Sequence, residues 1–228
     1  MLGLQRRRSR QPIRLAAGGF TIVELMVSTA VFGTVMLIIA VGALRFTHDY
    51  YKGVVSSRTQ EAARAIMSEL TQSLQFGTDV SATNNGGSTI LNGYCMGSVE
   101  YSAAMGYQVT PTGSLGPHQA QHGLVKRIGV SGCGTGLPTD DVIAGPFDPT
   151  TQRELLGPHM RVAALDITQL NTDLYQIHLK IIYGDDDLLN PAVTAGTTDF
   201  SGEGCSGAAG SQWCAVSDLT TTVNKRIQ

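Results

Sequence analysis

A lone glutamate inside an apolar segment is the residue in this sequence most open to a chemical role. Glu24 is the only charged residue between Phe20 and Leu44. A carboxylate inside a membrane-spanning helix costs about 2.5–3.5 kcal/mol on the lenient insertion scale, so it is a functional candidate that needs a partner. The segment contains no lysine or arginine. We therefore expect another molecule to supply the partner. The alternative is a protonated glutamate that faces lipid near the interface.

Two histidines, His118 and His122, have the spacing of a metal-binding pair on a helix. They follow Gly116-Pro117, in a region without a helical pattern, and no glutamate lies between them. The pattern of a zinc protease is therefore absent. We expect both to be solvated loop histidines.

The acidic run Asp185-Asp186-Asp187 could offer oxygen ligands to calcium, together with the downstream residues Asn190, Asp199 and Glu203. The glycine and distal glutamate of the EF-hand spacing are absent. We expect a charged, solvated loop and no metal, and keep Asp185 and Asp187 only as calcium candidates.

Other patterns typical of enzymes are incomplete. The glycines of the segment 129–136 have the look of a phosphate-binding loop, but no lysine or helical pattern follows them. No serine, histidine and aspartate occur in a recognisable nucleophile context. We expect no enzyme activity and no cofactor.

The elements that must position Glu24 begin with the apolar segment itself. Its 25 residues, if helical, are long enough for the roughly 30 Å core of a bilayer. Five arginines precede it, which places the amino terminus in the cytoplasm by the positive-inside rule. A cleaved secretory signal, with a site at Val41-Gly42-Ala43, would have a shorter apolar core. An ordinary signal anchor explains the length but not Glu24.

The leader and the start of this segment resemble the class III signal of type IV prepilins. The match consists of a basic leader that ends at Gly19, then Phe20, and a glutamate at the fifth position, Glu24. The resemblance implies that a prepilin peptidase removes the leader 1–19 by cutting between Gly19 and Phe20, and methylates the new amino group of Phe20. It also implies that Glu24 pairs with that amino group on a neighbouring subunit during assembly.

The helix is expected to continue to Phe76, so that one helix covers 20–76. Its first part, 20–44, would be the transmembrane or filament-core half. Its second part has an apolar stripe at the spacing of a helix face, with Gly77 as carboxyl-terminal cap; the stripe consists of Tyr51, Val55, Ala62, Ile66, Leu70 and Leu74.

The remaining residues, 77–228, predict a β-rich globular domain on the second half of the helix, an α+β, pilin-like fold. Alternating residues predict a hairpin of 161–169 and 174–183. Weaker strands are expected near 89–91, 99–101, 106–110, 124–130 and 213–223. We expect one antiparallel sheet, and a long loop without structure of its own over 184–212.

All four cysteines lie in this domain, which the predicted orientation places outside the cytoplasm, where disulfides persist. Three pairings are open. Cys205 and Cys214 bracket a short glycine-rich loop, and we predict that they pair, which leaves Cys95 with Cys133. A zinc site is disfavoured because no CxxC spacing occurs.

The charge distribution limits the class of partner. The first 19 residues hold five of the 16 basic residues and none of the 18 acidic residues. The rest of the chain is therefore acidic and unsuited to general nucleic-acid binding. The apolar content of 42% with only 15% charged residues also excludes a disordered chain.

The residues from Cys205 onward are similar to the end of PilW-type minor pilins. The resemblance implies a minor type IV pilus subunit that helps to initiate, prime or cap the filament. The alternatives are a J-like pseudopilin of a type II secretion system, or a pilus-tip adhesin or DNA-uptake module. The expected partners are the prepilin peptidase, other pilins and minor pilins, the inner-membrane assembly platform, and the lipid bilayer before assembly. The expected location is the inner membrane, then the pilus on the cell surface.

Overall fold

The computed structural model describes residues 19–84, 91–110, 118–130, 147–190, 200, 202–207 and 209–226. The chain divides into two compact units, Met1–Phe46 and Thr47–Gln228. Helix α1 (Ile22–Phe76) contributes residues to both units. It begins two residues later than predicted and ends at the predicted residue. The two units are described separately below.

In the first unit, α1 is a bare apolar helix. Every side chain from Gly19 to Phe46 is exposed, including large apolar ones such as Phe32 and Ile38. The helix passes through Gly33 and Gly42 without a break, because no proline interrupts its hydrogen-bond ladder. This part of α1 is long and apolar enough to cross a membrane.

In the second unit, α1 has one buried stripe. Its members recur every three or four residues, which places them on one helix face; they are Val55, Thr59, Ala63, Ile66, Met67, Leu70 and Leu74. The predicted stripe is therefore correct at Val55, Ile66, Leu70 and Leu74 and wrong at Tyr51 and Ala62. Ala63 takes the buried position in place of the half-buried Ala62, and Tyr51 stays 39% exposed.

The predicted hairpin is present as part of a three-stranded antiparallel sheet. Strands β8 (Met160–Gln169) and β9 (Leu174–Tyr183) pair with each other, and β9 also pairs with β12 (Ala215–Asn224) along its whole length. In β9, buried residues alternate with half-buried ones, as expected for a strand with one face on the core.

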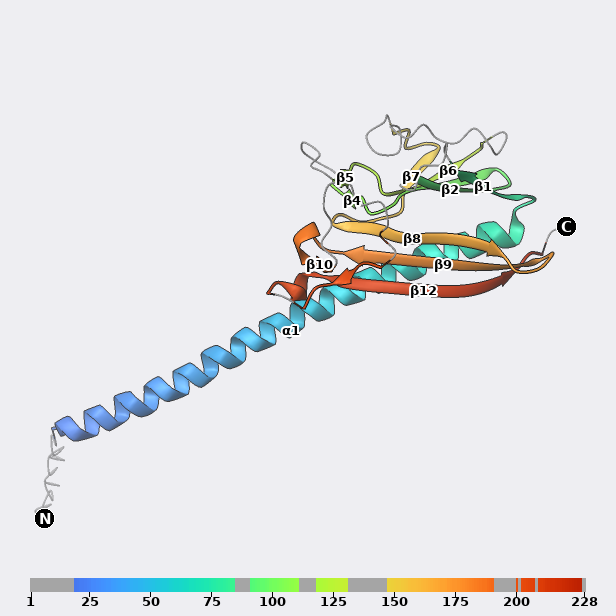
Figure 1. Cartoon of the computed structure of the whole chain (residues 1–228). Coiled ribbons are helices and arrows are strands. Elements are labelled where there is room, and N and C mark those ends of the chain that lie inside the picture. Colours follow the sequence, from blue (N-terminus) through green and yellow to red (C-terminus); the bar gives the residue numbers. More distant parts are fainter. Residues whose placement is uncertain are drawn as a thin grey trace, which may run out of the picture. The chain divides into compact units, whose positions relative to one another are not determined.

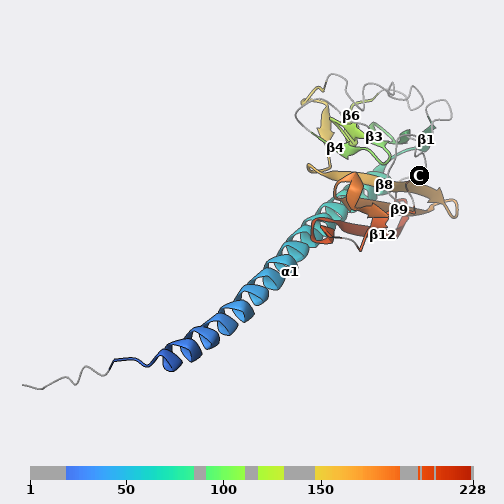
Figure 2. The same cartoon turned by 60° about the vertical axis from the view of Figure 1, so that its left-hand side comes forward.

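A second antiparallel sheet has five strands in the order β1-β2-β3-β6-β7. Its strands are β1 (Val80–Asn84), β2 (Leu91–Met96), β3 (Val99–Ala104), β6 (Leu124–Ile128) and β7 (Gln152–Glu154). The prediction of one sheet is therefore wrong. The views agree that this sheet lies on one side of β8, with β9 and β12 on the other (Figure 1, Figure 2).

The smaller elements are two strand pairs and two 3-10 turns. Strand β4 (Gln108–Val109) pairs in parallel with β5 (Gln119–Ala120), and β10 (Leu189–Asn190) pairs with β11 (Gly204–Cys205). The turns are η1 (Asp186–Leu188) and η2 (Ser211–Trp213).

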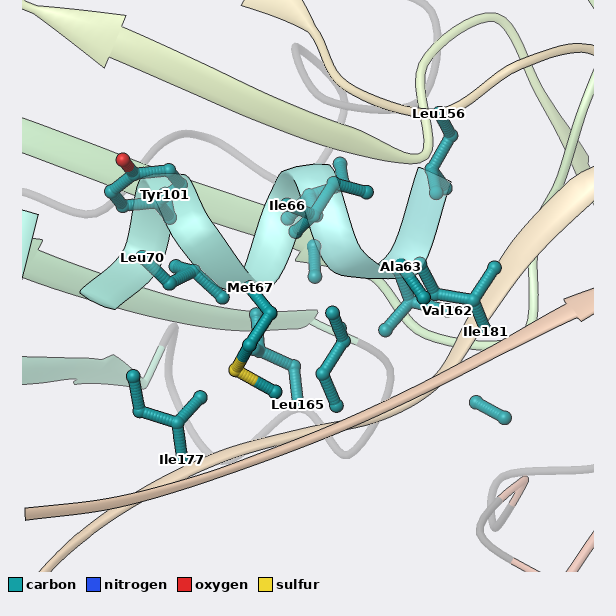
Figure 3. Packing of buried hydrophobic residues seen from close by; sticks show 14 of the residues in the cluster. Ala63, Ile66, Met67, Leu70, Tyr101, Leu156, Val162, Leu165, Ile177 and Ile181 are labelled. Carbon is teal, nitrogen blue, oxygen red and sulfur yellow. The ribbon is translucent and has the colours of Figure 1, made fainter. Parts of the chain in front are cut away.

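The core of the second unit lies where α1 meets both sheets. Met67 points toward Leu165 and Ile177 of the three-stranded sheet, and Leu70 lies next to Tyr101 of β3 (Figure 3). Tyr101 is fully buried, and its hydroxyl is hydrogen-bonded to Ser73 Oγ at 2.7 Å. Burial raises the pKa of the Tyr101 hydroxyl above its ordinary value. This tyrosine therefore fixes α1 on the five-stranded sheet by packing and by hydrogen bonding.

Gly77 ends α1 by close packing. A Cβ at this position would lie 2.8 Å from the carbonyl oxygen of Ser73 and 3.2 Å from Met96. A larger residue would collide with the last turn of α1 and with Met96, at the point where the chain turns from α1 toward β1. The glycine is thus required at the predicted position, through the lack of space for a side chain.

The expectation of an unstructured loop over 184–212 is wrong. The described part of this segment contains η1, β10, β11 and η2. Leu189 and Phe200 are buried in the core, and the ring of Phe200 packs directly on Gly106, where a Cβ would come within 2.2 Å. The apolar residues of the segment are too sparse for a periodic pattern, yet Leu189 and Phe200 fill places in the core.

Candidate functional site

Glu24 lies in the first turn of α1, whose start is capped by Thr21. The backbone N–H of Glu24 donates to Thr21 Oγ1 at 3.2 Å, and the N–H of Leu25 donates to the Thr21 carbonyl at 3.1 Å. Thr21 therefore satisfies one of the free N–H groups that every helix start presents. The spacing of Thr21 and Glu24 is that of a capping box, a signal that the sequence analysis missed.

The Glu24 side chain is exposed and has no hydrogen bond or ion pair with any residue that the structure describes. Its helical neighbours are apolar and equally exposed: Phe20 at 81%, Ile22 at 80% and Leu25 at 60%. An unpaired carboxylate in an apolar, uncovered surface is unfavourable unless another molecule covers the surface and partners the charge. The exposed segment and its carboxylate together form an incomplete site.

Gly19 and Phe20 directly precede the helix, and both are exposed. A Cβ added to Gly19 would meet no atom within 4 Å. The fold of the described residues therefore gives no reason for glycine at position 19.

The cysteine prediction is met where the structure describes it. Cys205 and Cys214 form a disulfide, with 5.6 Å between their Cα atoms. Cys95 is also disulfide-bonded. Cys133, its predicted partner, lies outside the described residues.

The acidic run 185–187 contacts protein groups and does not converge on a common centre. Asp186 forms an ion pair of 2.6 Å with the guanidinium of Arg161, which is fully buried in β8. Arg161 also donates to the carbonyls of Gly106 and Gly184, at 3.1 and 3.0 Å. This buried arginine thus holds the start of the segment 184–190 against the sheet, so the expectation of a solvated loop is wrong for Asp186.

Asp185 is held by two neighbouring side chains. Its Oδ1 accepts a hydrogen bond of 2.6 Å from Gln108 Nε2 and lies 3.2 Å from His159 Nδ1. The hydrogen bond from Gln108 is the main reason why the pKa of Asp185 lies below its ordinary value.

Asp187 is exposed and has no side-chain partner among the described residues. Within the part of the chain that the structure describes, no three His, Cys, Asp or Glu side chains are grouped so that they could hold a metal. Asp199, which the calcium hypothesis also used, lies outside the described residues.

The two histidines are not the solvated loop residues that we expected. His118 is half-buried, with its ring 5.8 Å from that of Tyr107 and 5.9 Å from that of Phe200. His122 stacks on Phe147 at 4.6 Å, with Nδ1 at 3.7 Å from Glu154 Oε2. Strand β5 separates the two residues, so they do not share a helix face.

The sequence analysis also missed the role of Arg161. A single arginine among the apolar residues that begin this strand, Met160–Leu165, is the signal that could have identified it, because a buried charge needs a partner. The acidic run that supplies this partner follows the next strand. Of the glycine-rich segment 129–136, residues 131–136 lie outside the described residues.

Comparison with protein-family models, with curated proteins and with solved structures finds no match for this chain.

Proposed function

We propose that this chain is a prepilin-like subunit that is anchored in the membrane by α1 and then assembled into a type IV filament. The observation that carries the proposal is the unpaired Glu24 in the first turn of an exposed apolar helix, directly after Gly19-Phe20. Lipid covers such a helix before assembly, and the helices of other subunits cover it afterwards.

Gly19 supports the processing step of this proposal. Nothing in the described structure occupies the space beside its Cα. A peptidase that seats the chain between positions 19 and 20 would require a small residue there. In this proposal the leader 1–19 is removed, Phe20 becomes the first residue, and its free α-amino group is methylated.

Glu24 supports the assembly step. A buried carboxylate is tolerated when a charge of opposite sign lies beside it in good geometry. The apolar segment contains no basic side chain, so the nearest cation of the required kind is the α-amine of Phe20 on a neighbouring subunit. Pairing of Glu24 with this amine would fix the axial stagger between subunits.

The size of the second unit and its two sheets suit a low-abundance subunit that initiates, primes or caps the filament. The partners in this proposal are the prepilin peptidase, other pilins and the inner-membrane assembly platform. A J-like pseudopilin of a type II secretion system would use the same two steps. Genes beside this one distinguish the two: a retraction ATPase indicates a pilus, and a secretin with exported hydrolases indicates secretion.

The test separates processing from assembly. Gly19→Leu should block leader removal, and the uncut chain should stay in the membrane because its arginines cannot cross the hydrocarbon. Glu24→Val should be cut normally but should be depleted from filaments. The measurement is the amount of mature-sized protein in membranes and in sheared filaments.

Matched controls are Gly53→Leu, where an added Cβ meets no atom within 4 Å, and Glu61→Val, which removes an exposed carboxylate from the part of α1 that belongs to the second unit. Both should be cut and assembled. Normal cutting of Gly19→Leu would refute the processing step. Filament entry of Glu24→Val at the wild-type level would refute the ion pair.

A further inference from the structure

A cavity of about 470 Å³ opens on the second unit beside η1 and η2. One of its lining residues, Trp213, contacts Tyr51 in the middle of α1. Its lining combines aromatic, acidic and apolar side chains with one histidine; the residues are His159, Tyr183, Gly184, Asp185, Asp187, Leu188 and Trp213. The volume falls in the range of protein ligand sites. The proposed filament function does not use this cavity.

Aromatic rings form its walls. The Trp213 ring packs on Tyr51 at 4.5 Å between centroids, yet Trp213 remains 43% exposed. Tyr51 thus covers part of the indole and leaves the rest open to the cavity. Tyr183 and His159 form the opposite side, with their rings 6.0 Å apart. An open indole surface attracts cations through the negative charge of its face.

The charges at the cavity are negative. Asp187 has no side-chain partner among the described residues, and Asp185 shares only its Oδ1 with Gln108 and His159. The nearby cation, Arg161, is fully buried and occupied by Asp186 and two carbonyls. No lysine or arginine is among the described lining residues, so the carboxylate of Asp187 is not neutralised from within.

A second cavity of about 520 Å³ adjoins the first and shares two of its residues, His159 and Tyr183. Ala62, Ala65, Pro158 and Met160 form most of its apolar lining, and Arg58 and Glu61 of α1 add one charge of each sign. The two cavities therefore offer adjacent places for a cationic group and for an apolar group.

We propose that these two cavities form a docking site for an extended segment of a partner polypeptide that presents a lysine or arginine next to an apolar side chain. The basic side chain enters between Trp213, Tyr183 and Asp187. The apolar neighbour lies over Ala62, Ala65 and Met160. Charge complementarity selects a polypeptide over a neutral ligand, and the apolar second cavity selects it over a small free amine.

Trp213 provides a direct readout because it is the only tryptophan of the chain. The test titrates the full chain in neutral-detergent micelles with the peptide acetyl-Gly-Ser-Lys-Leu-Ser-Gly-amide and follows tryptophan fluorescence, with calorimetry in parallel. We expect a saturable signal that weakens with added salt. Replacement of the peptide lysine by glutamine, or of its leucine by glycine, should weaken the binding.

The matched variants are Asp187→Asn and Asp79→Asn. Both positions are exposed and their carboxylates have no side-chain partner among the described residues, but Asp79 lies just after α1, away from the cavity. Asp187→Asn should weaken peptide binding by about three- to tenfold, the scale of one exposed charge contact with a cation that also touches a ring. Asp79→Asn should leave it unchanged.

Two results would overturn the proposal. The first is that neither fluorescence nor calorimetry detects the peptide, or that Asp187→Asn and Asp79→Asn weaken binding equally. The second is that spermidine binds as tightly as the peptide, which would make the cavity a site for free amines. Neither result depends on Glu24 or on leader removal, so failure here leaves the filament proposal intact.

Discussion

The two halves of α1 share one helical geometry and differ in what covers them. From Gly19 to Gly53 every side chain is exposed, whereas from Val55 to Leu74 a stripe is buried under two sheets. From Ile22 to Leu44 the helix is apolar on all sides apart from Glu24, whereas the second half is apolar on one side only. A continuous helix therefore does not imply a continuous environment. The sheets of the same chain cover the second half. No described residue covers the first half.

A truncation in each half gives the largest expected contrast. Leu70→Ala removes a fully buried side chain from the core and should destabilise the second unit by about 2–5 kcal/mol. Leu37→Ala removes a side chain of the first unit that is 66% exposed, so it should leave the second unit unchanged. The measurement is urea unfolding of the full chain in neutral micelles, followed by Trp213 fluorescence. Equal midpoints for the two variants would show that the stripe does not hold the sheets.

The disulfide of Cys205 with Cys214 gives the next largest effect. It joins two cysteines nine positions apart and so closes a short loop that contains Trp213, whose ring contacts Tyr51 near the start of the covered half. The double variant Cys205→Ser/Cys214→Ser should lose about 2–3 kcal/mol by the loop-entropy estimate. The same urea unfolding measures it. A double variant is preferable to a reducing agent, because Cys95 is also disulfide-bonded. An unchanged midpoint would mean that the loop is held by its packing alone.

The sequence predicted the features that rest on periodicity. The apolar helix, the buried stripe from Val55 to Leu74 and the hairpin of β8 and β9 each repeat a pattern over many residues, so one irregular residue does not obscure them. The end of α1 was predicted from a local signal, because Gly77 directly follows Phe76, the last apolar residue of the helix.

The features that the sequence did not predict rest on single long-range contacts. Strands β5, β10 and β11 have two residues each, too few for any alternation. Phe200 and Arg161 order the segment 184–190 and its surroundings through one ring contact and one ion pair, between residues far apart in the chain. The site at Glu24 was found because one charge in an apolar run is conspicuous. The cavity beside Trp213 was not found, because its walls come from separate elements.

Two adjacent acids test whether Arg161 orders the segment 184–190. Asp186→Asn leaves the buried guanidinium without its carboxylate and should destabilise the second unit by about 2 kcal/mol, less than a fully buried pair because Asp186 is partly exposed. Asp187→Asn removes the same charge from a side chain without a described partner and should change stability by less than about 0.5 kcal/mol. Urea midpoints decide between them. If the two variants behave alike, Arg161 does not depend on Asp186.

The same result bears on removal of the whole segment. Deletion of 185–203 would take away Asp186 together with the buried Leu189 and Phe200. We therefore expect this deletion to unfold the second unit. A loop without structure of its own, as the sequence predicted for 184–212, would instead tolerate the deletion. Near-native fluorescence of Trp213 in the deleted chain would restore that expectation.

The smallest expected effect is a pH dependence at Asp185. The hydrogen bond from Gln108, and to a lesser degree the contact with His159, hold the pKa of this carboxyl below its ordinary value. In the unfolded chain the pKa is about 3.9, so the unfolded state takes up the proton at a higher pH than the folded state. The stability that Asp185 contributes is thus complete above the unfolded pKa and is lost as pH falls through the folded pKa.

Asp185→Asn tests this contribution because asparagine retains the oxygen that accepts from Gln108 and removes only the charge. The difference in urea midpoint between wild type and this variant should be larger near about pH 5 than near about pH 3, where the carboxyl of the unfolded chain is largely protonated. Asp187→Asn is the control, since its carboxylate has no described partner that would make its difference from wild type change over this range. If the midpoint difference for Asp185→Asn stays constant between the two pH values, the charge of Asp185 does not contribute to the stability of the second unit.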